Sequence, residues 1–123
     1  MLSRVNRVFS RRVRAFAIVP IETPEALQEQ LSQQDKVVVI DWFADWCGPC
    51  QMMRPFYEQL SEKHNDAVFL AVDADKMQGV AQQLGVTALP TFHVVKNNEM
   101  LSKVEGANES GLSNAVEEAL KAE

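Results

Sequence analysis

Two cysteines separated by two residues are the feature of this sequence best suited to chemistry. Cys47 and Cys50 follow an apolar, β-branched run and precede a segment with helical spacing, and in that context C-x-x-C indicates redox chemistry. At a helix N-terminus, unpaired backbone N–H groups and the helix dipole stabilise a thiolate, which is the attacking species in disulfide exchange. We therefore expect Cys47 to be the nucleophile. Cys50, one turn into the helix, should resolve the mixed disulfide that Cys47 forms.

The residues beside the cysteines suit this role. Gly48 and Pro49 make the turn between the cysteines compact and stiff, and proline is favoured in the first turn of a helix. Trp46 precedes the pair, where its ring is expected to shield the sulfur atoms and to offer a flat apolar contact. The motif is thus expected to be a rigid turn with an apolar surface at its edge.

Asp41 is an acid within a segment that should be buried. Val37–Phe43 reads Val-Val-Val-Ile-Asp-Trp-Phe, which predicts a central strand covered on both faces. Burial disfavours the ionised carboxyl group and raises its pKa, which suits a general base acting on a thiol. The alternative is that Asp41 is a core polar group that simply hydrogen-bonds the backbone.

Metal and nucleotide chemistry have little support. A C-x-x-C can form half of a zinc site, but the sequence has no second pair, and His64 and His93 are expected at a helix end and in a strand. No glycine-rich phosphate loop is present, so no motif for binding NADPH or a flavin is visible. We therefore expect no metal and no bound cofactor, and the electrons must come from a partner protein.

The length and charge of the chain limit its number of domains and its possible partners. The chain has 123 residues, of which 46% are hydrophobic and 24% charged, as is typical of one globular domain. No window approaches 18 uninterrupted apolar residues, which excludes an apolar transmembrane segment. Residues 20–123 hold seven Lys or Arg against all seventeen Asp and Glu. An acidic body repels phosphate backbones, so we expect no nucleic-acid partner.

Residues 1–16 have the composition of a transit peptide, because they are rich in arginine and contain no acid. At about 100° per residue, a helix would separate the cations from the apolar side chains. Such a helix contacts anionic membrane surfaces during import, so we expect a mitochondrial matrix protein cleaved near Arg14–Phe16. The alternatives are a plastid protein, or a cytoplasmic protein with a disordered basic tail. The two faces would carry Arg4, Arg7, Arg11 and Arg14, and Leu2, Val5, Phe9, Val13 and Phe16.

Residues 17–123 alternate strand and helix patterns and are expected to form one α/β domain. The pattern predicts a central mixed sheet of about five strands flanked by about four helices. A hairpin is expected around Asn97–Asn98, and Pro55 should kink its helix. The expected strands are Ala17–Ile21, Val37–Phe43, Ala67–Val72, Thr91–Val95 and Met100–Glu105. The expected helices are Pro24–Gln34 after an N-cap at Thr23, Gln51–His64, Lys76–Leu84 ended by Gly85, and a last helix capped by Asn108.

Three segments, in this order, resemble the thioredoxin family. They are Trp46-Cys47-Gly48-Pro49-Cys50 after Val-Ile-Asp-Trp-Phe-Ala-Asp, then Val86-Thr87-Ala88-Leu89-Pro90-Thr91-Phe92, then Glu105-Gly106-Ala107-Asn108. The likeness extends from about Val19 to Ala122, and the five-residue motif is highly specific by itself. The resemblance implies the thioredoxin fold and the reduction of protein disulfides. Together with the leader, it makes the chain similar to mitochondrial thioredoxins of eukaryotes.

The resemblance also implies roles for individual residues. Asp41 would be the buried carboxylate that helps to deprotonate Cys50, and Pro90 would be the cis-proline that faces the disulfide. An NADPH-dependent thioredoxin reductase would recharge the pair, peroxiredoxins and methionine sulfoxide reductases would be clients, and the protein would be a monomer. An apolar groove would hold an extended substrate segment by backbone hydrogen bonds, framed by Thr87, Ala88, Leu89, Pro90, Gly106 and Ala107.

Two positions depart from the common family pattern. Trp42-Phe43 reverses the usual Phe-Trp order, which removes an indole from the side near the disulfide and predicts a weaker fluorescence response to reduction. Phe69 stands where many bacterial members have a lysine that pairs with the buried acid. Proton movement around Asp41 therefore cannot be copied from those proteins.

Two other functions are compatible with a C-x-x-C domain. A dithiol oxidase or isomerase usually has His or Tyr between its cysteines, whereas this chain has Gly48-Pro49. A non-catalytic binding subunit would use the same fold as an interaction module. A glutathione redox titration separates the oxidase from the reductase, and a cysteine double mutant that kept full biological activity would favour the binding subunit.

Overall fold

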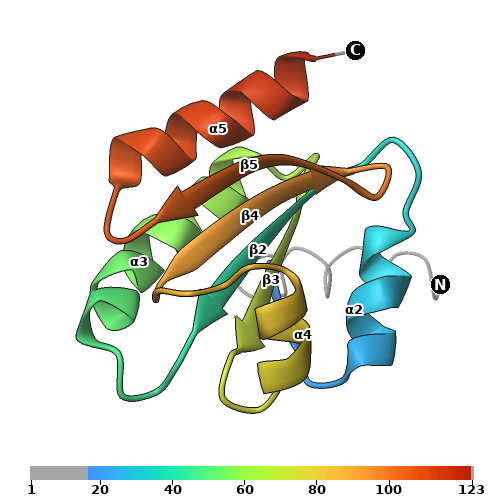
Figure 1. Ribbon diagram of the computed structural model, residues 1–123. Helices are drawn as coiled ribbons and strands as arrows, with labels where there is room; N and C mark the ends of the chain where they lie inside the picture. The colour runs from blue at the N-terminus through green and yellow to red at the C-terminus, as the bar shows by residue number, and fades with distance from the viewer. Residues whose placement is uncertain (1–16, 123) are drawn as a thin grey trace, which may run out of the picture.

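The computed structural model describes residues 17–122, and the leader predicted at residues 1–16 lies outside the described residues. Strands and helices alternate through most of this region, as the sequence pattern predicts (Figure 1). The elements are β1 (Ile18–Ile21), α2 (Pro24–Leu31), β2 (Val37–Phe43), α3 (Gly48–Lys63), β3 (Val68–Asp73), α4 (Gln78–Gln83), β4 (Thr91–Lys96), β5 (Glu99–Glu105) and α5 (Glu109–Lys121).

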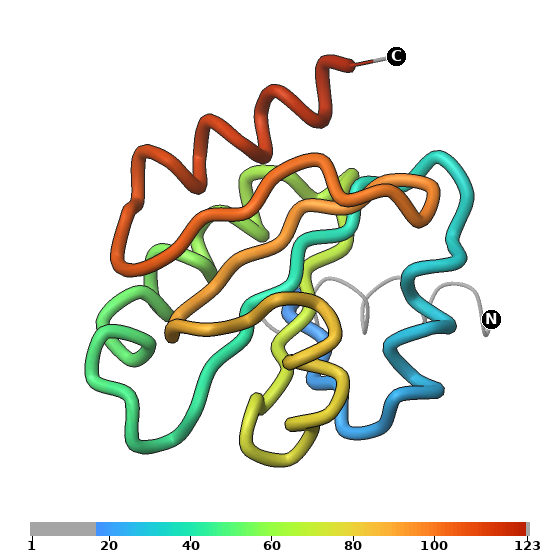
Figure 2. Tube along the Cα trace, in the orientation of Figure 1, coloured from blue at the N-terminus to red at the C-terminus, as the bar shows by residue number. Residues whose placement is uncertain are grey.

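The five strands form one mixed sheet, which confirms the predicted fold class. Their order is β1-β3-β2-β4-β5; β1, β3 and β2 are parallel, whereas β4 is antiparallel to both β2 and β5. Trp42, near the end of β2, pairs with Val72 of β3 and with Thr91 of β4. The carboxyl ends of β2 and β3 therefore meet the beginning of β4 at one end of the sheet, where the loop to α3 leaves (Figure 2).

Helices cover both faces of the sheet. α3 and α5 bury Tyr57 and Leu112 on one face, and α2 and α4 bury Leu27 and Ala81 on the other (Figure 1). Side chains alternate along a strand, so β2 contributes Val37 and Val39 to the first core and Val38, Ile40 and Trp42 to the second. By the same alternation, Asp41 and Phe43 face α3.

Local chemistry sets the ends of the helices. The side chain of Thr23 accepts a hydrogen bond from the amide of Ala26 at 3.1 Å, and that of Asn108 accepts one from Gly111 at 2.9 Å, so both predicted N-caps are confirmed. α3 begins at Gly48, earlier than the predicted Gln51, because the cysteine turn is itself the first turn of the helix. α3 continues through Pro55 to Lys63.

The turns follow the predicted glycine and asparagine signals. Asn97 and Asn98 have φ angles of 53° and 63°, as a two-residue hairpin turn requires. Gly85 has a φ of 77° just after α4, a conformation in which glycine avoids a Cβ clash. α2 ends at Leu31, before the predicted Gln34, and the chain then turns through Asp35, whose amide bonds to the side chain of Asn97 at 2.8 Å. No helix within residues 17–122 is long and apolar enough to cross a bilayer.

Candidate active site

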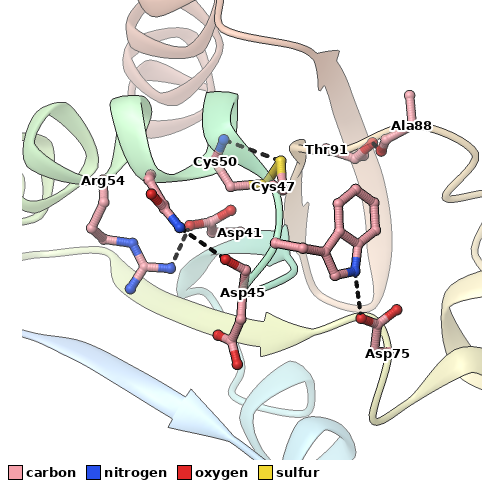
Figure 3. The surroundings of a disulfide bond; sticks show 10 residues. Asp41, Asp45, Cys47, Cys50, Arg54, Asp75, Ala88 and Thr91 are labelled. Atoms are coloured by element: carbon pink, nitrogen blue, oxygen red, sulfur yellow. Dashed lines mark hydrogen bonds and ion pairs between the residues drawn. A yellow bond between two sulfur atoms is a disulfide. The ribbon is translucent and has the colours of Figure 1, made fainter.

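The two cysteines form a disulfide at the N-terminus of α3 (Figure 3). Their Cα atoms are 5.3 Å apart. Cys47 is the N-cap of α3, and its sulfur accepts a hydrogen bond from the amide of Cys50 at 3.2 Å. After reduction, this amide and the helix dipole are placed to stabilise a thiolate on Cys47. The sequence-based expectation of a cysteine pair at a helix start is therefore confirmed.

Residues on either side hold the cysteine turn in place. Gly48 and Pro49 are exposed at the start of α3. Trp46 is 72% exposed, and its indole N–H donates to Asp75 Oδ2 at 2.7 Å (Figure 3). The side-chain amide of Gln51 donates to the backbone oxygen of Asp45 at 2.8 Å. Trp46 thus offers the exposed apolar surface that we expected, but nothing local in the sequence signals its partner Asp75, which follows β3.

Asp41 lies under α3 with an arginine as its partner. Its side chain is 2% exposed, and its Oδ2 accepts a hydrogen bond from Arg54 at 3.0 Å. Within the described chain its Oδ1 has no hydrogen-bond partner, so the alternative of a carboxyl satisfied by the backbone is not what the structure shows. Arg54 also lies over the Phe43 ring, 5.0 Å from its centroid.

The buried environment of Asp41 changes its acidity. Burial raises the pKa of Asp41 from its ordinary value of 3.8 to about 6, although the charge of Arg54 acts in the opposite direction. The predicted rise in pKa is therefore confirmed. Sequence reasoning missed Arg54. The available signal was its spacing: Arg54 is four residues after Cys50, which places both side chains on the same face of α3.

The segment expected to bind substrate lies beside the disulfide. The Leu89–Pro90 peptide bond is cis, as expected, and the oxygen of Pro90 accepts a hydrogen bond from the amide of Gly106 at 2.8 Å. Leu89 packs against the buried cluster of Ala44, Cys47 and Cys50. The loop before β4 is thereby joined to the loop after β5 and packs through Leu89 on the cysteine pair.

Hollows border this segment on the surface. One, of about 370 Å³, is lined by Trp46, Thr87, Ala88 and Leu89 among others, and another, of about 680 Å³, by Ala107 and residues of α3 and α5. Thr87 and Ala88 are exposed, and the hydroxyl of Thr91 donates to the oxygen of Ala88 (Figure 3). Of the residues expected to frame a groove, Thr87, Ala88 and Leu89 border the first hollow and Ala107 the second, whereas Pro90 and Gly106 line neither.

The reversed Trp42-Phe43 pair places its two rings on opposite faces of the sheet. Trp42 is fully buried between the sheet and α2/α4, and its indole N–H donates to His93 Nδ1 at 3.0 Å. Phe43 instead faces α3 and packs against the cysteine cluster. The reversed order therefore moves the indole away from the disulfide, as the sequence implied. Phe69 packs against Tyr57 in the core, with ring centroids 5.4 Å apart.

Neither histidine belongs to the cysteine site: His93 is buried in the sheet, and His64 lies at the end of α3. Burial lowers the pKa of His93 from 6.5 to about 4, with a smaller contribution from Lys103, so its ring is neutral at pH 7 and can accept the hydrogen bond from Trp42. His64 follows α3 and lies 3.8 Å from Glu117 of α5. Among residues 17–122, no three His, Cys, Asp or Glu side chains are grouped so as to hold a metal ion.

Comparison with known proteins gives a consistent result. The thioredoxin family model matches residues 18–118. Sheep thioredoxin is 44% identical over 101 residues, covering 81% of this chain and 96% of that protein, and human thioredoxin is 42% identical over 99 residues, covering 80% and 94%.

Solved structures agree with the sequence comparisons. Oxidised mitochondrial thioredoxin 3 from Saccharomyces cerevisiae has a TM-score of 0.78 at 31% identity, covering 85% of this chain and 98% of that one. A chain from a structural study of the thiol-resolving mechanism in yeast mitochondrial 1-Cys peroxiredoxin via glutathione/thioredoxin systems has a TM-score of 0.78 at 30% identity, covering 85% and 97%.

Proposed function

This chain belongs to the thioredoxin family and is a protein-disulfide reductase, and we propose that it acts in mitochondria as an electron carrier recharged by an NADPH-dependent thioredoxin reductase. The observation that carries the catalytic mechanism is the Cys47–Cys50 disulfide at the start of α3, above a buried carboxyl that faces the same helix. Residues 17–123 are its thioredoxin domain and residues 1–16 its transit peptide.

The reaction proceeds in two displacements. The Cys47 thiolate attacks one sulfur of a client disulfide, which forms a mixed disulfide and releases the other client sulfur as a thiolate. Asp41 then accepts the proton of the Cys50 thiol, and the Cys50 thiolate attacks Cys47 of the mixed disulfide. The second client sulfur leaves as a thiolate. The client gains two electrons, and the Cys47–Cys50 disulfide closes.

The environment of each group supports its role. The N-terminal turn of α3 favours negative charge on Cys47. The raised pKa of Asp41, about 6, makes its carboxylate a stronger base than an exposed one, yet leaves it mostly ionised at neutral pH. Trp46, Thr87, Ala88, Leu89, Pro90, Gly106 and Ala107 form the surface that receives the client segment.

The mitochondrial location and the partners rest on separate observations. The arginine-rich, acid-free leader and the likeness to a yeast mitochondrial thioredoxin support the location. The likeness to a chain studied with a mitochondrial peroxiredoxin supports peroxiredoxins as clients, and methionine sulfoxide reductases are proposed by family alone. We propose a monomer without bound cofactor. Mass spectrometry of the protein recovered from mitochondria tests the leader, and an intact Met1 would refute cleavage.

Two cysteine variants test the mechanism. Full-length protein is mixed with NADPH, a mitochondrial thioredoxin reductase and insulin, and NADPH oxidation is followed. Turnover should require Cys47 and Cys50. In a mitochondrial extract, Cys50→Ser should form covalent complexes with clients, because the mixed disulfide cannot be resolved, and the matched Cys47→Ser should form none. Equal trapping by both variants would refute the assigned roles, and no turnover by folded wild type would refute the proposed electron source.

A further inference from the structure

Arg54 connects the buried carboxyl to the surface of the protein. Its guanidinium lies 3.0 Å from Asp41 Oδ2, and its side chain is 32% exposed, whereas that of Asp41 is 2% exposed. The guanidinium also lies over the Phe43 ring, 5.0 Å from the centroid. A planar guanidinium can stack on an aromatic ring and bind a carboxylate at the same time. Both contacts hold Arg54 beside Asp41, and Figure 3 draws the bond between the arginine and the carboxyl.

Two hollows meet at this arginine. A small one of about 180 Å³ is lined by Cys50, Gln51 and Arg54 together with the end of β2, and a larger one of about 510 Å³ runs along β1. Arg54, Phe43 and Asp45 line both. Arg54 therefore lies between the resolving cysteine, the buried carboxyl and solvent.

We propose that Arg54 is a positioning residue for the resolving step: its guanidinium holds Asp41 in place as a carboxylate that can accept the Cys50 proton. The inference rests on the proposed role of Asp41. Arg54 does not itself accept the proton, because a guanidinium stays charged in proteins. Its charge favours the carboxylate, and its bond to Oδ2 at 3.0 Å fixes the position of the carboxyl under α3.

The charge of Arg54 is needed because the rest of the surroundings favour a protonated Asp41. Burial raises the pKa of Asp41, and Arg54 is the group that lowers it. From α3, burial raises the pKa of Tyr57, and the nearby charge of Asp41 raises it further. Besides Arg54, the charged groups that line the larger hollow are Glu22, Asp45, Glu58, Asp73 and Lys76, an excess of acids that also disfavours negative charge on Asp41.

Stopped-flow reduction of 5,5′-dithiobis(2-nitrobenzoate) by the reduced full-length protein separates the two displacements. The first aromatic thiolate is released by the attack of Cys47, and the second by the attack of Cys50 on the mixed disulfide. The pH dependence of the second phase reports the ionisation of the group that assists Cys50. In Arg54→Gln we expect the midpoint of that dependence to rise by about one pH unit, with resolution about tenfold slower below the midpoint. The first phase should change much less.

Matched variants keep the outcomes distinct. Arg54→Lys keeps the charge but not the planar stacking, so its midpoint should lie between those of wild type and Arg54→Gln. Lys63→Gln removes the same charge from an exposed site on the same helix, where Lys63 pairs with Glu117 at 3.5 Å, and should leave the midpoint unchanged. An unchanged or lowered midpoint in Arg54→Gln, or equal shifts in Arg54→Gln and Lys63→Gln, would overturn the proposal.

Asp41→Asn separates this proposal from the mechanism on which it rests. If Asp41 accepts the proton, Asp41→Asn slows the second phase and removes its ionisation midpoint. An unchanged second phase in Asp41→Asn would refute the role of Asp41 itself. An effect of Asp41→Asn without a shift in Arg54→Gln would refute only the role of Arg54. If Arg54→Gln does not fold, Arg54→Lys decides, and a midpoint identical to that of wild type would then count against the need for a stacked guanidinium.

Discussion

Asp41 should reduce the stability of the oxidised protein at neutral pH, and its removal should therefore stabilise the fold. The carboxyl has an ordinary pKa of 3.8 and a folded-state pKa of about 6, and at about 1.4 kcal/mol per pH unit this difference corresponds to about 3 kcal/mol. Because Asp41 is 2% exposed, solvent screening does not reduce this value much. Asp41→Asn keeps the side-chain volume and removes the ionisation, so it should gain about 3 kcal/mol at pH 7.5.

The pH dependence gives the sign of the effect. Well below pH 3.8 the carboxyl is protonated in both the folded and the unfolded chain, so Asp41→Asn and wild type should be equally stable. Between pH 4 and about 6 the folded protein binds more protons than the unfolded chain, so wild-type stability falls as pH rises. The advantage of Asp41→Asn should grow through this window and stay constant above it.

Urea unfolding of the oxidised full-length protein, followed by far-UV circular dichroism at pH 4, 5, 6 and 7.5, measures this difference. Asp45→Asn is the matched control, because Asp45 is an exposed acid close to the same site, and its effect should stay within about 0.5 kcal/mol. If Asp41→Asn lowered the stability at pH 7.5, the ion pair with Arg54 would outweigh the cost of burial. A gain that did not depend on pH would also refute the reasoning.

Three further variants test other contacts. Tyr57→Phe should lower the free energy of unfolding by about 1–2 kcal/mol, because the hydroxyl donates its one hydrogen to the buried oxygen of Leu70 at 2.7 Å, with the oxygen of Val39 3.1 Å away; urea unfolding measures this, and an unchanged midpoint would contradict it. Trp46→Phe should remove most of the change in tryptophan emission on reduction, because the other indole, Trp42, lies across the sheet from the disulfide; an undiminished response would show that Trp42 senses the sulfurs. Gly106→Ala should cost about 1 kcal/mol or more, because its φ is 82°, and equal stability of the two proteins would show that the loop relaxes.

Much of the fold could be predicted because its signals are local. The largely apolar segment Val37–Phe43 can bury its side chains only as a strand covered on both faces. This strand is the centre of the observed sheet. Thr23 and Asn108 cap helices through side-chain bonds to amides three residues later. The Asn97–Asn98 turn depends on two residues that tolerate positive φ. Each of these features involves residues close together in the sequence.

The limits of local reasoning appear at the element ends. The spacing of apolar residues placed the active-site helix from Gln51, whereas the cysteine motif implied a helix that begins at Cys47, and the observed start at Gly48 agrees with the motif. There, the cysteine sulfur takes the place of a usual capping oxygen and accepts the amide of Cys50. A capping sulfur is not one of the ordinary N-cap signals, so the pattern alone did not reveal it.

By itself, the sequence determined the cysteine pair at a helix start, the buried acid in the strand before it, and the alternation that turns Trp42 away from both. Only the tertiary structure decided which side chains complete the site. Arg54 was visible one helical turn after Cys50, but its bond to Asp41 depends on how α3 packs on β2. Asp75 reaches Trp46 across 29 residues, and His93 reaches Trp42 across 51. Such partners are set by strand register and helix packing, in which the whole core takes part, so no pattern in neighbouring residues encodes them.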